Sequence, residues 1–404
     1  PSILHELAGQ VGKAIFAVCG TNGKTTVNNL LWAALLAEGE KVICNRTGSN
    51  MLNGVAAAFV LSADAKGNLD ADYACIEIDE ASTSEVFAHF KPDYMVLTNL
   101  FRDQLDRYGE IDAIMDILKS VMQSAPHIKV IFNGDDPLSA FLVMDSGSDS
   151  AAYGISERVI GSNLSREIRE GRFCRVCGTQ LTYGFYHYGQ LGDYICPKCG
   201  FQRPAIQFDG RNIELGEEIK FTVGGRCFSS DLKGLYSVYN ILAAYAGIRT
   251  AGLKAKHFRQ ALLDFQPKNG RMEEFWIGDT KVWLNLAKNP TGFNQNIDVM
   301  LRDGSSKKLV IVINDNDQDG TDISWLWDVD FERLRGLKED CITVSGIRCQ
   351  DLGLRLKYAG IRSELEPDAE KAIKSYIDKG SRSLYVLVNY TALFDIRNIL
   401  KRMG

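Results

Sequence analysis

The stretch Gly-Thr-Asn-Gly-Lys-Thr-Thr at residues 20–26 is the most informative segment of the sequence. It follows the apolar run 14–19 and precedes residues 25–38, whose leucines and alanines recur on one helical face. The glycines would let backbone N–H groups close around anionic oxygens, and a following helix adds the positive end of its dipole. A glycine turn that only caps a helix is the simpler interpretation. Because strand, glycines, lysine, threonine and helix coincide, the segment predicts a phosphate-binding loop.

Each residue of this loop is a candidate contact for a nucleotide: Gly20, Thr21, Asn22, Gly23, Lys24, Thr25 and Thr26. Lys24 would place a positive charge on the outer phosphates, which makes it a candidate catalytic residue. The Thr25 hydroxyl would reach Mg²⁺. The loop is shorter than the common G-x-x-x-x-G-K-[ST] form, because Val18 stands where that form has its first glycine.

Strand-length and helix-length segments alternate around the loop, which predicts an α/β fold with a largely parallel sheet. Expected strands are 14–19, 41–44, 73–78, 94–98 and 130–132, and expected helices are 25–38, 51–61, 111–121 and 239–250. Residues 205–230 favour antiparallel strands with turns at Asp209-Gly210 and Gly224-Gly225. A second α/β rhythm begins near Val282, with strands at 309–314, 341–344 and 384–388. We therefore expect two domains, residues 1–268 and residues 269–404.

The amino-acid composition excludes several classes of protein. The 404 residues are 45% hydrophobic and 24% charged, which excludes wholesale disorder. The net charge of −5 argues against a general nucleic-acid binder. No apolar run is long enough to span a bilayer, and the first residues lack a signal-peptide pattern. The sequence does not begin with methionine, so it allows further residues upstream of Pro1. Scattered cysteines in such a chain indicate reduced thiols and a cytoplasmic protein.

A cluster of four cysteines interrupts the α/β rhythm at about residues 170–205. The pattern is Cys-x₂-Cys-x₁₈-Cys-x₂-Cys, formed by Cys174, Cys177, Cys196 and Cys199. This spacing is typical of a zinc ribbon, and four thiolates leave no open position on Zn²⁺, so we expect a structural site. Disulfides or redox pairs are the alternatives, but the expected cytoplasmic setting and the loop-rich sequence between the pairs argue against them.

The short phosphate loop resembles that of Mur ligases and folylpolyglutamate synthetases. These families activate a carboxylate with ATP, pass through an acyl phosphate and let an amine attack. Further motifs of these families have counterparts at residues 98–106, 133–137, 234–244 and 270–273. The resemblance implies that Asn240 contacts the nucleotide and that Arg271 meets the outer phosphates. It also implies a Mg²⁺-binding Glu, for which we favour Glu80 and keep Glu77 as the alternative.

Several positions depart from the amino-acid-adding Mur ligases. Gln104 replaces a usual His, and Tyr236-Ser237 replaces His-Asn. The family pattern D-x-x-H-N-P becomes Asn-Leu-Ala-Lys-Asn-Pro at 285–290, and Lys288 cannot act as a neutral His there. These changes argue against an ordinary ligase that adds a free amino acid.

An acidic loop with two tryptophans, residues 314–332, follows the expected strand at 309–313. Together with the cysteine cluster it resembles the MurT family, the Mur-ligase-like subunits of lipid II isoglutaminyl synthase. The resemblance implies a central Mur ligase domain, a Rossmann-like C-terminal domain and a heterodimer with a glutaminase, GatD. Such a pair amidates the α-carboxylate of D-glutamate in the lipid II stem peptide, at the inner face of the membrane, with ammonia from glutamine.

The residues agree with a separate glutaminase. That enzyme needs an activated Cys nucleophile with a His base, whereas this sequence has no G-x-C-x-G elbow and its five histidines occur in no suggestive context. The resemblance implies that the last Asp of the D-G-x-D pattern, here Asp322, completes the partner's Cys-His pair. An Asp in that place would orient the His tautomer and stabilise its cation.

Two other functions stay open. The first is a free-standing ligase that adds an amino acid to a folate or a muropeptide, without a glutaminase. The second is a non-catalytic ATP-binding scaffold with a zinc ribbon. The intact Lys24, Thr25 and Arg271 argue against the scaffold, since a scaffold has no need to clamp a transition-state phosphate.

Overall fold

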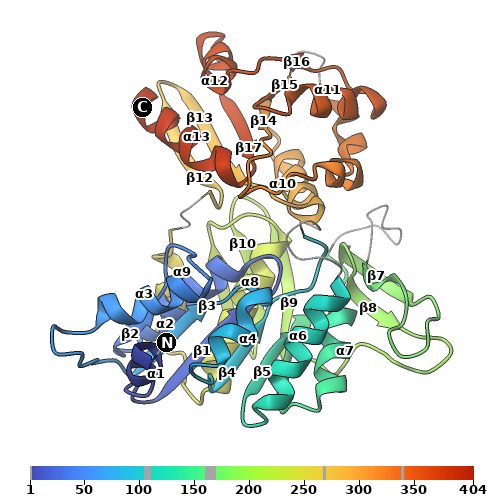
Figure 1. The fold of residues 1–404 in the computed structure, drawn as a ribbon. Helices are drawn as coiled ribbons and strands as arrows, with labels where there is room; N and C mark the ends of the chain where they lie inside the picture. The colour runs from blue at the N-terminus through green and yellow to red at the C-terminus, as the bar shows by residue number, and fades with distance from the viewer. Residues whose placement is uncertain (1, 104–110, 160–169, 267–269, 338–340) are drawn as a thin grey trace. The chain divides into compact units, whose positions relative to one another are not determined.

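The structure is a computed structural model that describes residues 2–103, 111–159, 170–266, 270–337 and 341–404 (Figure 1). The described residues form two compact units. Unit 1 comprises the chain up to residue 265 except residues 102–103, and unit 2 comprises those two residues and the chain from 266 onward. The predicted division between residues 268 and 269 lies outside the described residues.

Unit 1 is built on a nine-stranded sheet in the order β11-β10-β9-β6-β5-β4-β1-β3-β2. Its strands are β1 (Ala14–Cys19), β2 (Val42–Cys44), β3 (Tyr73–Glu77), β4 (Tyr94–Leu97), β5 (Lys129–Asn133), β6 (Ser150–Ile155), β9 (Phe208–Leu215), β10 (Ile219–Val223) and β11 (Arg226–Ser230). Neighbours are parallel from β2 to β9, and β10 and β11 are antiparallel. The predicted α/β class with largely parallel sheets is confirmed.

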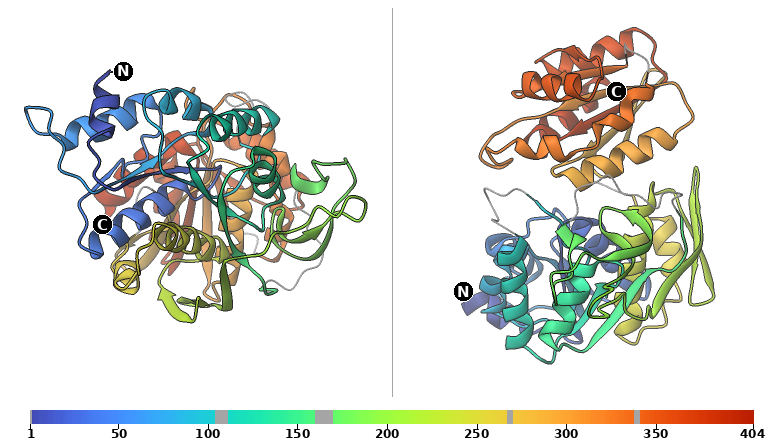
Figure 2. Two further views of the ribbon diagram at one scale, coloured as in Figure 1. Left: turned by 90° about the horizontal axis from the view of Figure 1, so that it is seen from below. Right: turned by 90° about the vertical axis from the view of Figure 1, so that its right-hand side faces the viewer.

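Helices cover both faces of this sheet (Figures 1 and 2). They are α1 (Ser2–Ala8), α2 (Lys24–Ala37), α3 (Leu52–Ser62), α4 (Thr83–Phe87), α6 (Ile111–Ser124), α7 (Pro137–Ser146), α8 (Leu235–Thr250) and α9 (Phe258–Leu263), with 3₁₀ turns η1 (Glu80–Ser82) and η2 (Glu170–Arg172). Helices α2 and α8 pack together on one face, where their buried side chains join those of β1, β5 and β6. Helices α4, α6 and α7 lie on the other face.

The antiparallel end of the sheet contains one error of the sequence-based prediction. The Gly224-Gly225 turn joins β10 to β11 as expected, but Asp209 and Gly210 lie inside β9 and form no turn. A Cβ atom at Gly210 would lie 2.8 Å from Leu242 of α8. This glycine therefore serves close packing between strand and helix, which a turn pattern cannot distinguish.

A two-stranded hairpin, β7 (Thr182–Tyr188) and β8 (Leu191–Ile195), stands apart from the large sheet. The cysteine pairs flank it on either side, so the hairpin and the two cysteine turns form one inserted element. We call this element, residues 170–205, the ribbon.

Unit 2 has a six-stranded sheet in the order β12-β13-β17-β14-β15-β16, parallel except for β12. Its strands are β12 (Glu273–Ile277), β13 (Thr280–Leu286), β14 (Lys307–Val312), β15 (Ile342–Ser345), β16 (Glu364–Leu365) and β17 (Ser383–Val388). Its helices are α10 (Pro290–Arg302), α11 (Cys349–Tyr358), α12 (Ala369–Asp378) and α13 (Tyr390–Met403), with 3₁₀ turns η3 (Ser324–Asp328) and η4 (Phe331–Gly336). Side chains of α12 and α13 form a core with β13, β14 and β17.

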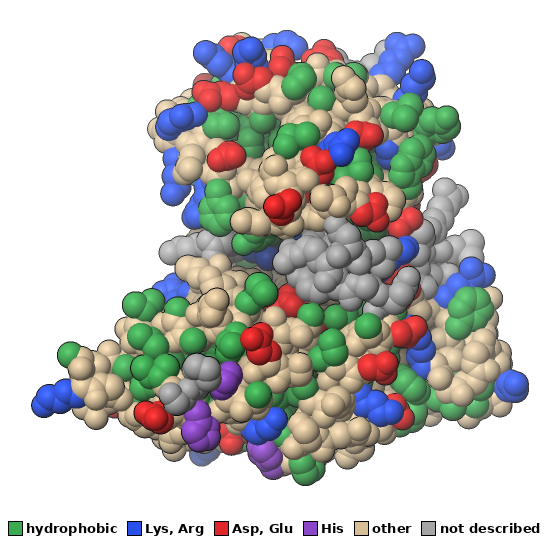
Figure 3. All heavy atoms as spheres, in the orientation of Figure 1, with side chains coloured by type: hydrophobic (Ala, Val, Ile, Leu, Met, Phe, Trp, Pro, Cys, Tyr) green, Lys and Arg blue, Asp and Glu red, His purple; other side chains and the backbone are tan. Residues whose placement is uncertain are grey.

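The surface of each unit mixes acidic and basic side chains (Figure 3). Within the described ranges, no helix combines the length and apolar character that a bilayer crossing requires.

Candidate active site and metal centre

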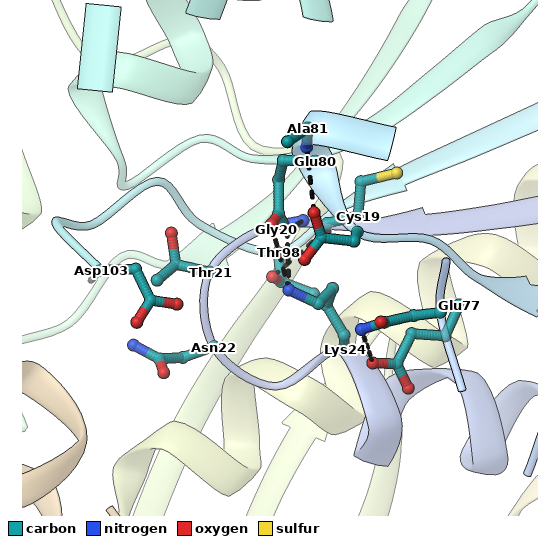
Figure 4. A network of polar contacts seen from close by, with 12 residues as sticks. Cys19, Gly20, Thr21, Asn22, Lys24, Glu77, Glu80, Ala81, Thr98 and Asp103 are labelled. Atoms are coloured by element: carbon teal, nitrogen blue, oxygen red, sulfur yellow. Dashed lines mark hydrogen bonds and ion pairs between the residues drawn. The ribbon is translucent and has the colours of Figure 1, made fainter. Parts of the chain in front are cut away.

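The predicted phosphate loop lies between β1 and α2 and closes tightly on its neighbours (Figure 4). Gly20 has φ +117°, and a Cβ atom there would lie 2.2 Å from the Thr98 hydroxyl and 2.8 Å from the Asn99 carbonyl. Gly23 has φ +91°, and its Cβ would lie 2.2 Å from Oδ1 of Asn240 on α8. Only glycine fits either position. The structure therefore places Asn240 directly against the loop, and its predicted contact with the nucleotide stays a prediction.

Lys24 begins α2 and forms a buried ion pair. Its Nζ donates to Glu80 Oε1 at 2.8 Å and to Oε2 at 3.2 Å, and both side chains are less than a tenth exposed. The Gly20 N–H donates to the same Glu80 Oε1 at 2.5 Å. Burial alone would lower the pKa of Lys24, but the carboxylates of Glu80, Asp79 and Glu77 raise it above its ordinary value. The loop therefore carries a fixed positive charge.

Glu77 ends β3, and its side chain lies near the same glycine, Gly48, as the hydroxyl of Thr25. The Asn45 side chain holds the Glu77 backbone, because its Oδ1 accepts from the Glu77 N–H and its Nδ2 donates to the Glu77 carbonyl. Asn50 Nδ2 donates to Glu77 Oε1 at 3.0 Å. The other oxygen, Oε2, is buried and has no hydrogen-bond partner among the described residues. A Cβ atom at Gly48 would lie 3.6 Å from Glu77 Oε2 and 3.4 Å from Thr25 Oγ1. Two oxygens of the kind that Mg²⁺ prefers thus border Gly48.

The outer side of the loop is held by the segment that follows β4. Asn99 Oδ1 accepts from the Asn22 N–H at 3.0 Å, and Asn99 Nδ2 donates to the Asn22 carbonyl at 3.0 Å. The Thr21 hydroxyl donates to the Phe101 carbonyl and accepts from the Phe101 N–H, both at 2.9 Å. Thr26 is buried in the first turn of α2. The conformation of the loop therefore depends on the position of residues 99–101.

The four predicted zinc ligands converge. The Sγ atoms of the following residues lie within 4.8 Å of one another: Cys174, Cys177, Cys196 and Cys199. In both pairs a glycine of positive φ, Gly178 or Gly200, donates its N–H to the carbonyl of the first cysteine. Hydrogen bonds from Thr179 lower the pKa of the Cys177 thiol to about 6, which favours the thiolate that a metal needs, whereas burial raises the pKa of the Cys174 thiol to about 12. Of the described residues, only this group brings three or more Cys, His, Asp or Glu side chains close enough to hold one metal ion.

The acidic loop follows β14 at the carboxyl end of the unit 2 sheet. Asn389, at the end of β17, accepts from the Asn314 N–H at 3.1 Å and donates to the Asn314 carbonyl at 2.6 Å. Asp319 is buried and accepts from both the backbone N–H and the hydroxyl of Thr391. These contacts fix the loop on two adjacent strand ends, where α/β proteins commonly place sites.

Asp322 has a different environment from Asp319. It is half-buried and accepts from the N–H and the hydroxyl of Ser324, at 2.8 and 3.0 Å. These bonds lower the pKa of Asp322 below its ordinary value, so they favour the carboxylate form further. Nearby, Trp325 packs on buried Phe293, whereas Trp327 is 51% exposed.

Arg271 and Lys288 also belong to unit 2. Arg271 precedes Met272, whose N–H donates to Asn285 Oδ1 at 3.1 Å. Lys288, which replaces the usual His, donates to Asp103 Oδ2 at 2.6 Å. Gln104 lies outside the described residues.

Sequence analysis missed the residues that position these side chains. Asn45 and Asn50, which hold Glu77, belong to no motif that we used. Asp136 and Gln190 connect the ribbon to residue 100, as described below. The motif counterpart at residues 133–137, to which the sequence assigns no role, is the one signal that could have indicated Asp136.

Comparison with known proteins gives relatives for the whole chain. Residues 18–192 match the Mur ligase middle domain family, and residues 286–393 match the MurT ligase C-terminal family. The chain is 35% identical over 402 residues to the lipid II isoglutaminyl synthase (glutamine-hydrolyzing) subunit MurT of Staphylococcus aureus (strain COL), covering 99% of this chain and 90% of that protein. It is 32% identical over 403 residues to the same-named subunit of Streptococcus pneumoniae (strain ATCC BAA-255 / R6), covering 98% and 89%.

A solved structure has the same fold over nearly the whole chain. It is a pseudomurein peptide ligase type C from Methanothermus fervidus, with a TM-score of 0.75 and 20% identity, covering 99% of this chain and 80% of that one. At this identity the likeness shows the fold, which is that of Mur ligases.

Proposed function

Because the chain belongs to the MurT family, we propose that it is the ATP-dependent ligase subunit of a lipid II isoglutaminyl synthase. The near-full-length similarity to two MurT subunits carries this proposal. The buried Lys24, the tight glycine turns and Asn240 at the loop support it, since they are the parts of a nucleotide site.

The proposed reaction amidates the α-carboxylate of D-glutamate in the stem peptide. A carboxylate oxygen attacks the γ-phosphorus of ATP, the bond to the β-phosphate oxygen breaks, and an acyl phosphate and ADP result. Ammonia then attacks the acyl carbon, phosphate leaves with the former carboxylate oxygen, and the nitrogen loses a proton. Lys24 would stabilise the charge on the transferring phosphoryl group, and Arg271 would add a second positive charge.

The residues beside the loop fit a Mg²⁺ ion. Thr25 Oγ1 and Glu77 Oε2 meet around Gly48, and Glu77 Oε2 lacks another partner among the described residues. Both oxygens of Glu80, which we favoured from sequence, are engaged by Lys24. We therefore propose Thr25 and Glu77 as the protein ligands and Glu80 as the counter-ion of Lys24. Bound Mg²⁺ would neutralise charge on the β- and γ-phosphates.

Ammonia would come from a partner glutaminase of the GatD type, held in a heterodimer. This chain would contribute Asp322, whose ionised carboxylate orients the partner's catalytic His. The four cysteines would bind a structural Zn²⁺. We further propose that residues 1–268 and 269–404 act as the ATP-binding and C-terminal domains, at the cytoplasmic face of the membrane.

The decisive experiment is reconstitution of the chain with a GatD-type glutaminase, ATP, Mg²⁺ and lipid II or a soluble muropeptide. Mass spectrometry should detect amidated product when glutamine is added. Transfer of an amino acid by the chain alone would favour a free-standing ligase. Nucleotide binding with no product from any nitrogen source would favour a scaffold.

A further inference from the structure

The turn between β7 and β8 of the ribbon is buried in unit 1. Gln190, in this turn, is fully buried, and each polar atom of its amide is used. Its Nε2 donates to the Leu100 carbonyl and to Asp136 Oδ1, both at 2.7 Å, and its Oε1 accepts from the Gly171 N–H at 2.7 Å. A side chain of the ribbon therefore contacts the segment that follows β4.

The peptide groups of Leu100 are held from both sides. The Leu100 N–H donates to Asp136 Oδ2 at 2.8 Å, while its carbonyl accepts from Gln190. Asp136 is itself fixed by Ser139, whose hydroxyl donates at 2.5 Å, and by the Leu138 N–H. Gln190 and Asp136 thus form one rigid support with Leu100.

Leu100 stands between the two residues that hold the phosphate loop. Asn99 pairs with Asn22, and Phe101 pairs with Thr21. The Leu100 N–H belongs to the planar peptide unit that it shares with Asn99, and the Leu100 carbonyl belongs to the unit that it shares with Phe101. A shift of these two units would therefore move both contacts, because the second unit also carries the Phe101 N–H that donates to Thr21.

Side-chain packing also links the ribbon turn to Phe101. The Phe101 ring lies 6.1 Å from the Tyr188 ring, centroid to centroid. A Cβ atom at Gly189 would lie 2.7 Å from the Phe101 ring. The ribbon turn is thus pressed against the residue that contacts Thr21.

We propose that Gln190 is a positioning residue for the phosphate loop, so that the zinc ribbon sets the affinity of the enzyme for its nucleotide. The route runs from the ribbon turn through Leu100 to Asn99 and Phe101, and from these to the loop. The inference rests on the proposed function for the identity of the ligand as ATP.

Gln190→Glu tests the route with little change in side-chain volume. It keeps an acceptor for Gly171, removes both donors, and places a carboxylate against Asp136. Tyr194→Phe is the matched control, because it removes one buried hydrogen bond between the ribbon and the Gly134 carbonyl and leaves Leu100 untouched. Both variants should retain wild-type zinc content.

The readouts are the Kd of the full chain for Mg·ADP and the KM values of its complex with the glutaminase. Gln190→Glu should raise Kd and the KM for ATP about tenfold, while the KM for ammonium stays constant. Tyr194→Phe should leave all these constants unchanged. Equal values for wild type and Gln190→Glu, or equal losses in both variants, would overturn the inference. Failure of the wild type to bind Mg·ADP would instead refute the proposed function.

The wild-type protein offers a second test that needs no folded variant. Coupling is reciprocal, so Mg·ADP should slow amide hydrogen exchange in residues 186–193 of the ribbon turn. The hairpin of β10 and β11 serves as the reference. Unchanged exchange in residues 186–193 under saturating nucleotide would contradict the inference.

Discussion

At the scale of single residues, Lys24 is the side chain on which the proposed chemistry depends most. Lys24→Ala should abolish amidation with either nitrogen source, because it removes the buried charge that we propose acts on the outer phosphates. We expect a loss of at least several powers of ten in kcat/KM. The control is Lys41→Ala, which removes an exposed lysine that pairs with Asp70 on the same unit. Wild-type turnover by Lys24→Ala would show that the loop is not catalytic.

The two glutamates at and after the end of β3, Glu77 and Glu80, have different partners and should therefore respond differently to substitution. Glu77→Gln should raise the Mg²⁺ concentration needed for half-maximal activity by more than the roughly 10–100-fold cost of losing an outer-shell partner. Glu80→Gln should leave the Mg²⁺ requirement near wild type and destabilise the fold, since Lys24 would keep a buried charge with one partner fewer. A magnesium titration of both variants, with thermal unfolding, measures this. The opposite order of Mg²⁺ requirements would return the ligand role to Glu80.

Asp322 should matter only when glutamine is the nitrogen source. Asp322→Asn should leave the heterodimer intact and cut glutamine-dependent amidation by about 10⁴-fold, as loss of the orienting Asp does in triads. Added ammonium should restore product, because the ATP site is unchanged. Asp317→Asn is the matched control, since it makes the same charge change at an exposed position of the same loop. Equal loss with both nitrogen sources would assign Asp322 to the ligase chemistry or the fold.

At the scale of elements, the periodic pattern of apolar residues predicted the strands. The sequence did not reveal contacts that only the tertiary fold makes. The strands around the loop fall within one or two residues of their predicted bounds, because buried apolar runs between helix-length segments have few other solutions. The Asp209-Gly210 turn was wrong, because a glycine that packs against α8 looks the same in sequence as a turn glycine. Gln190 could not be predicted, since its partners Leu100 and Asp136 are brought to it only by the tertiary fold.

The ribbon, residues 170–205, should stay folded only while zinc is bound. Cys177→Ser should remove the metal and expose residues 170–205 to protease, while the large sheet of unit 1 stays folded. Nucleotide affinity should fall at the same time, because Gln190 loses its position. Metal analysis, limited proteolysis and Mg·ADP binding measure the three effects, with exposed Cys227→Ser as the control. Full zinc content in Cys177→Ser would show that the four thiols are not the ligands.

At the scale of the whole molecule, the chain carries every residue that we assign to carboxylate activation. Lys24, Thr25, Glu77 and Asn240 belong to unit 1, and Arg271 belongs to unit 2. We therefore predict that the proposed partner glutaminase is needed only to release ammonia from glutamine.

The chain without its partner should therefore amidate its substrate when an ammonium salt is supplied. The rate should rise with pH as ammonium loses its proton, because only neutral ammonia has a lone pair for attack on the acyl phosphate. Glutamine should give no product without the glutaminase, and Lys24→Ala should abolish the ammonium reaction. Amidated product and ADP release, measured for the isolated chain and for the heterodimer, decide the matter. If ammonium supports the reaction only in the heterodimer, the glutaminase must complete the ligase site as well as feed it, and the assignment of activation to this chain alone fails.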